Sequence, residues 1–134
     1  MTTHAKGTFD VNLTPQSPDS SSQPAAISRL LIDKQFFGDL EAVSKGQMLA
    51  AGTAVTDSAG YVAVEEVKGV LNGRSGSFIL QHTGIMKRGQ PHLTISVVPD
   101  SGTGQLTGLI GEMTIIIEDG QHAYEFIYSL PDAF

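Results

Sequence analysis

The chain has 134 residues, and eight Lys and Arg against 14 Asp and Glu give it a formal net charge of −6. This acidic balance, without a basic stripe, disfavours a nucleic-acid binder and a protein docked on an anionic membrane. The absence of cysteine excludes disulfide scaffolds, thiolate metal sites and cysteine nucleophiles. We expect one globular domain over residues 1–134, with a cytoplasmic location by default, because no secretory signal or apolar run of about 18 residues occurs.

The first third of the chain predicts two strands around a loop. Residues 8–13 alternate apolar and polar side chains, which is typical of a half-buried strand. Residues 14–25 contain three prolines among serines, which predicts a flexible loop. Residues 27–37 fit both a helical stripe and a two-residue period, and we favour a strand because the neighbouring segments are typical of strands.

The rest of the chain predicts short strands joined by tight turns. Residues 40–55 form a long expected strand, in which Gly46 and Gly52 suggest bends. Asn-Gly at 72–73 and Asp-Gly at 119–120 suit type I′ hairpin turns. The remaining expected strands cover residues 61–71, 75–86, 92–98, 110–118 and 122–130.

About eight sequential strands with short connections favour an all-β, eight-stranded antiparallel up-and-down β-barrel, as in lipocalins. A barrel of this size is either filled by side chains or holds one small ligand. A two-sheet sandwich is the main alternative.

Three segments carry a resemblance to a known family. They are Phe37-Gly38-Asp39-Leu40, then Gly73-Arg74-Ser75-Gly76-Ser77-Phe78 within residues 69–84, and Ser101-Gly102-Thr103-Gly104 within residues 97–111. The chain resembles a bacterial family of domains of unknown function whose fold is similar to the allene oxide cyclase barrel of plants. This resemblance implies a barrel with a central cavity that often self-associates, so we expect a homo-oligomer. It implies no established activity.

Glu65 is the first candidate site residue. It shares a strand face with Tyr61, which is itself a candidate for ligand contact, whereas Glu66 and Lys68 face the other way. We place Glu65 inward because Lys68 beside Glu66 suits solvent, and because Glu65 falls at an acidic position of the family pattern. In an apolar cavity its pKa would be raised, and the carboxyl group could act as a general acid or base. The alternative is a surface glutamate in an ion pair.

His82 is the second candidate, on the next strand and on the same face as Phe78 and Leu80. Its imidazole could exchange protons near neutral pH or orient a ligand. The alternative is a core histidine with satisfied hydrogen bonds.

Four further residues are candidates for ligand contact. Arg74 lies in a turn and could bind an anion at the barrel mouth, Tyr124 and Phe126 could stack on a planar ligand, and Glu112 could extend an acidic lining. The alternatives are a turn-stabilising arginine, core packing and a solvent-facing carboxylate. The four histidines show no metal-ligand spacing, and no dinucleotide motif occurs, so we expect neither a metal nor a cofactor.

Three functions remain open. We favour a binding module that holds a small apolar or planar molecule, with Glu65 and His82 at the polar end of the cavity. The second is a cyclase- or isomerase-like enzyme in which Glu65 is the general acid or base and His82 assists. The third is a structural or oligomerising protein with a filled interior. The sequence leaves undecided whether the protein is an enzyme.

Overall fold

A computed structural model describes residues 2–16 and 27–131 of the chain. These residues form eight strands and one short 3-10 helix, η1. The bounds are β1 Thr3–Pro15, β2 Ile27–Gly38, β3 Leu40–Gly52, β4 Ala59–Leu71, β5 Arg74–Lys87, β6 Gln90–Val97, η1 Gly104–Leu106, β7 Ile110–Glu118 and β8 Gln121–Ser129. Within the described residues, no helix is long and apolar enough to cross a membrane.

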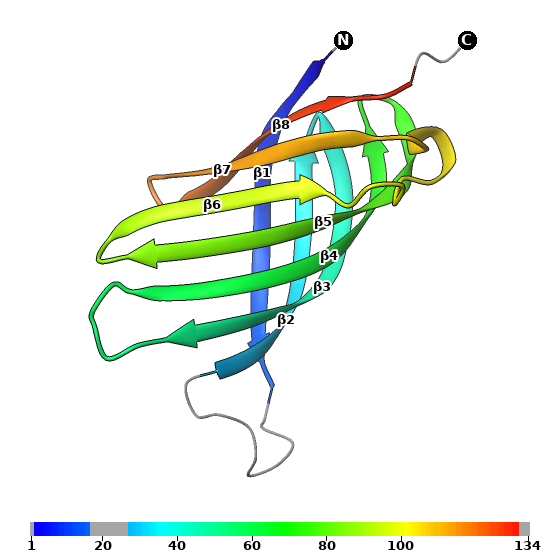
Figure 1. The fold of residues 1–134 in the computed structure, drawn as a ribbon. Helices are drawn as coiled ribbons and strands as arrows, with labels where there is room; N and C mark the ends of the chain where they lie inside the picture. Colours follow the sequence, from blue (N-terminus) through cyan, green and yellow to red (C-terminus); the bar gives the residue numbers. More distant parts are fainter. Residues whose placement is uncertain (1, 17–26, 132–134) are drawn as a thin grey trace.

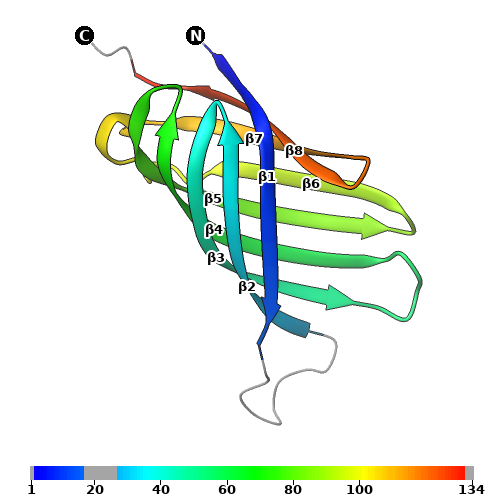
Figure 2. The same cartoon turned by 180° about the vertical axis from the view of Figure 1, so that it is seen from behind.

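The strands close into a barrel in sequence order (Figures 1 and 2). Each strand pairs antiparallel with the next, and β1 pairs with both β2 and β8. This confirms the predicted eight-stranded antiparallel up-and-down barrel and excludes the two-sheet sandwich. Closure pairs the strand edges that an open sheet would leave exposed. The ambiguous segment 27–37 is a strand, β2, as predicted.

The predicted hairpin turns have the expected backbone conformation. Asn72 and Gly73 have φ of 46° and 83°, and Asp119 and Gly120 have φ of 51° and 79°. Two consecutive residues with positive φ are the signature of a type I′ turn, which Asn-Gly and Asp-Gly favour. A third turn, at residues 88–89, has the same signs of φ.

The bounds of β1 and β3 differ from the sequence-based expectation by more than two residues. β1 extends from Thr3 to Pro15, so the first two positions of the expected loop 14–25 belong to the strand. Pro15 is tolerated there because it is the last residue of the strand, where its missing N–H disturbs few interstrand hydrogen bonds. The loop prediction for residues 17–25 lies outside the described residues. Gly46 does not interrupt β3, which continues to Gly52.

The two ends of the barrel differ in how they are filled. At the end formed by the β2–β3 and β4–β5 turns, the rings of Phe78 and Phe126 stack with centroids 5.7 Å apart, and Tyr128 lies 5.2 Å from Phe126. Leu106 of η1 and Leu109 are buried in the same hydrophobic cluster. We call this the closed end. The opposite end, formed by the β3–β4, β5–β6 and β7–β8 turns, is called the open end.

Candidate functional site

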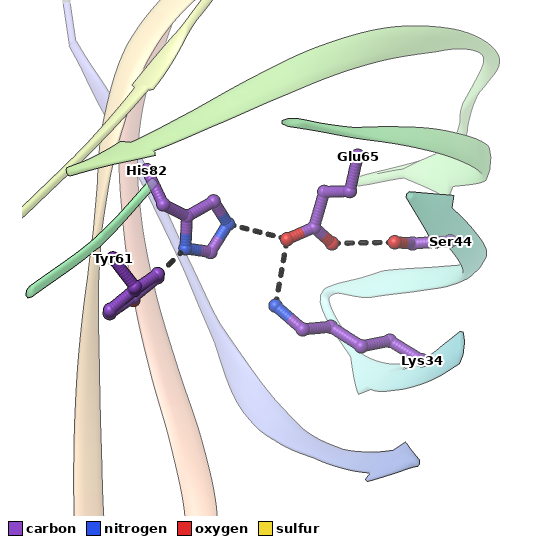
Figure 3. Close-up of polar contacts among 5 residues, drawn as sticks. All are labelled: Lys34, Ser44, Tyr61, Glu65 and His82. Atoms are coloured by element: carbon purple, nitrogen blue, oxygen red, sulfur yellow. Dashed lines mark hydrogen bonds and ion pairs between the residues drawn. The ribbon is translucent and has the colours of Figure 1, made fainter. Parts of the chain in front are cut away.

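A buried ionic cluster lies inside the barrel, on four adjacent strands (Figure 3). Glu65 of β4 is completely buried. Its Oε2 lies 2.8 Å from Nζ of Lys34 in β2 and 2.5 Å from Nε2 of His82 in β5. Its Oε1 accepts a hydrogen bond of 2.5 Å from Oγ of Ser44 in β3. We call these four residues the Glu65 cluster. Glu65 and His82 therefore face inward, as predicted.

The ionisation of Glu65 differs from the prediction. Burial raises the pKa of this carboxyl, but the hydrogen bond from His82 and the charge and hydrogen bond of Lys34 outweigh it and lower the pKa to about 2. Glu65 is consequently a carboxylate at neutral pH. The expectation of a raised pKa was wrong because it assumed an apolar surrounding without a cation.

Of the Glu65 cluster, the sequence analysis missed Ser44 and, with the larger consequence for charge, Lys34. Its side chain is only 7% exposed, and Nζ lies 5.1 Å from the ring centroid of Phe9 and 5.7 Å from that of Phe36. Contact with the faces of aromatic rings stabilises an ammonium group further. The alternation of Ile32, Lys34 and Phe36 in the sequence was the available signal, because it puts Lys34 on the buried face of β2.

A glycine allows β3 to approach the backbone of β4 closely at Glu65. Gly46 of β3 is the register partner of Glu65, and a Cβ at this position would lie 2.6 Å from Cα of Glu65. Real Cβ atoms do not approach other atoms so closely, so only glycine allows β3 and β4 to pack here without distortion. The glycine interpreted from the sequence as a bend thus serves close packing.

Tyr61 links the Glu65 cluster to a cavity at the open end. Its Oη lies 3.5 Å from Nδ1 of His82, on the far side of the imidazole from Glu65 (Figure 3). Tyr61 is half-buried and lines a cavity of about 610 Å³. Its register partner is Gly84, where a Cβ would lie 2.7 Å from Cδ1 of the tyrosine ring. Glycine at 84 therefore lets the ring pack closely against β5.

The cavity is lined mainly by apolar residues. They come from β3, β4, β5, β6 and β7 and include Met48, Ala50, Met86, Leu93 and Ile117. Glu65 and His82 are absent from the lining, because the Glu65 cluster lies deeper in the barrel than Tyr61. The sequence analysis did not single out these apolar residues, since apolar side chains on alternating strand positions are also the ordinary pattern of a filled core.

The other four candidates lie away from this cavity. Arg74 is exposed at the start of β5, at the closed end, and Glu112 is exposed on β7. Tyr124 is buried and donates a hydrogen bond from Oη to the carbonyl of Phe37, 2.9 Å away. Phe126 belongs to the closed-end stack. The structure thus brings together Tyr61, Glu65 and His82 and leaves these four residues elsewhere.

The fold and the site define a class: a closed eight-stranded antiparallel barrel with an apolar cavity at one end and a buried ionic cluster beneath it. The chain belongs to the family described as "Protein of unknown function (DUF3224)", whose model matches residues 5–128. This confirms the resemblance to a family of unknown function.

A solved relative has the same architecture. The chain is 52% identical to a protein of unknown function from the DUF3224 family of Shewanella oneidensis MR-1, with a TM-score of 0.92. The alignment covers 99% of this chain and 100% of that protein. No curated protein sequence matches the chain.

Proposed function

We propose that the protein binds a small apolar or planar molecule in the cavity at the open end. The observation that carries this proposal is the cavity itself, whose volume of about 610 Å³ is typical of small-molecule sites. Its wall includes large apolar side chains that are exposed to solvent: Ile117 is 65% exposed, Leu93 42% and Met86 39%. Contiguous exposed apolar surface is unfavourable unless it serves an interaction.

The expected driving force is burial of apolar surface. A two-ring aromatic ligand that covers about 300 Å² of apolar wall and ligand surface gains roughly 7 kcal/mol before the entropic cost of binding. The Tyr61 hydroxyl supplies a polar contact that orients the ligand. In this proposal Glu65 and His82 do not touch the ligand but position Tyr61.

The contacts of Glu65 favour binding over the enzyme hypothesis. A general base must reach the proton that it removes, and Glu65 is completely buried behind His82. Its oxygens are already engaged by Lys34, Ser44 and His82, and its pKa of about 2 leaves it a weak base. The filled-interior hypothesis describes the closed end but leaves the cavity at the open end without a role.

The test is a titration with the neutral apolar fluorophore N-phenyl-1-naphthylamine, whose emission rises in an apolar site. We expect saturable binding to the unmodified protein. Ala50 lines the cavity beside Tyr61, its register partner on the neighbouring strand, and Ala50→Trp should fill part of the cavity and weaken binding at least tenfold. Val43 of the same strand is 52% exposed on the outer surface, so Val43→Trp is the matched control and should bind like the unmodified protein. Absence of saturable binding, or equal effects of the two substitutions, would contradict the proposal.

A further inference from the structure

The hydrogen bonds of the Glu65 cluster determine which atoms of His82 carry hydrogen. Glu65 is ionised, and a carboxylate only accepts hydrogen bonds. Nε2 of His82, 2.5 Å from Oε2 of Glu65, must therefore be the donor. The other two partners of the carboxylate, Ser44 and Lys34, are donors as well.

The charge of the cluster fixes the other ring nitrogen. Glu65 and Lys34 form one buried anion and one buried cation at 2.8 Å, so the pair is already balanced. A further buried positive charge on His82 would be uncompensated and costly. A neutral imidazole with hydrogen on Nε2 has a lone pair on Nδ1, which makes Nδ1 an acceptor.

Nδ1 in turn fixes the direction of the Tyr61 hydroxyl. The Oη atom lies 3.5 Å from Nδ1, and an acceptor nitrogen requires Tyr61 to donate its single proton there. Burial, together with the charge of Glu65, raises the pKa of Tyr61, so the hydroxyl keeps this proton at neutral pH. What remains on Oη for a ligand in the cavity is lone pairs.

The rest of the cavity offers few other side chains to which a polar group of a ligand could hydrogen-bond. Among its described lining residues, the other polar side chains are those of Ser28 and His92, and both residues are exposed. Tyr61 is thus the polar side chain that contacts the half-buried part of the cavity.

We propose that the cavity selects apolar molecules that carry a hydrogen-bond donor, a hydroxyl or N–H group, and that this donor binds Oη of Tyr61. The selection rests on the proposed function. His82 and Glu65 act as positioning residues, because together they hold the proton of the Tyr61 hydroxyl on the side away from the ligand. An apolar molecule whose polar group only accepts hydrogen bonds would meet an oxygen without an available proton, so that both acceptors would stay unsatisfied.

The test compares three probes with the same ring system: naphthalene, 2-naphthol, which donates, and 2-methoxynaphthalene, which only accepts. Without a specific contact the more apolar methoxy probe should bind better. We expect the reverse, with 2-naphthol preferred about tenfold, the equivalent of one net hydrogen bond. Tyr61→Phe keeps the ring and removes Oη, so 2-naphthol should lose about tenfold in affinity while naphthalene is unaffected.

The possible outcomes separate this inference from the proposed function. If all three probes bind but 2-naphthol is not preferred, or if the preference survives in Tyr61→Phe, the inference is wrong and the binding function stands. If none of the probes binds, the binding function fails and the inference fails with it. Nitrogen NMR of the ligand-free protein gives a second readout, in which His82 should carry hydrogen on Nε2 only; hydrogen on Nδ1, alone or together with Nε2, would overturn the inference.

Discussion

Lys34→Met removes the cation that faces Glu65 and keeps a side chain of similar length. The change leaves a carboxylate with no exposed surface and without its ion-pair partner, previously 2.8 Å away. Breaking a buried ion pair in this way typically costs about 3 to 5 kcal/mol. Ser44 and His82 still donate to the carboxylate, so we expect the lower part of this range, about 3 kcal/mol.

The measurement is the free energy of unfolding from urea titration, with unchanged m-values as the check that the compared states are the same. Lys45 provides a matched control on the neighbouring strand. Its Nζ lies 3.8 Å from Asp33 on the outer surface, and the lysine side chain is 85% exposed. Exposed ion pairs contribute little, so Lys45→Met should leave the unfolding free energy unchanged within error.

A double variant tests the physical reason. Lys34→Met combined with Glu65→Gln leaves no uncompensated charge in the barrel, so it should be more stable than Lys34→Met alone. The reasoning is refuted if Lys34→Met costs less than about 1 kcal/mol, or if the effects of the two substitutions simply add.

Three further predictions concern the same barrel. Folding lowers the pKa of Glu65 from 4.5 to about 2, so this carboxylate should contribute about 3 kcal/mol to the unfolding free energy above pH 4.5 and lose that contribution as the pH falls from 4.5 to 2. Urea midpoints measured against pH should show this loss of stability for the unmodified protein, and the loss should be absent in Glu65→Gln. Gly84→Ala should displace the Tyr61 ring and weaken N-phenyl-1-naphthylamine binding several-fold, and unchanged affinity would contradict this role of the glycine. Phe126→Ala at the closed end should cost about 3 to 5 kcal/mol in a thermal or urea assay, yet leave fluorophore affinity within about twofold if the two ends are independent.

Much of the fold was readable from local patterns. Alternation with period two marks the strands, and dipeptides such as Asn72-Gly73 mark the turns, because both signals depend on residues adjacent in the chain. The same alternation groups Glu65 with Tyr61 on one face of β4 and His82 with Phe78 on one face of β5. It does not say which face is inward; for Glu65 that prediction came from Lys68 beside Glu66 and from the family pattern, and the burial of Glu65 agrees with it.

The composition of the site could not be predicted in this way. Lys34 and Glu65 are 31 positions apart and meet only because β2 to β4 curve around one lumen. The sequence correctly suggested that Glu65 is buried, but the sign of its pKa shift depends on whether a cation lies within a few ångströms, which is a property of the closed barrel.

The sequence by itself therefore determined the strands, the turns and which side chains of a strand share a face, because these follow from the geometry of neighbouring residues. Tertiary structure alone decided that Lys34 neutralises Glu65, that aromatic side chains fill one end of the barrel, and that Tyr61 borders a cavity at the other. The physical reason is that charge compensation and cavity volume depend on distances across the lumen, and barrel closure and strand register set those distances.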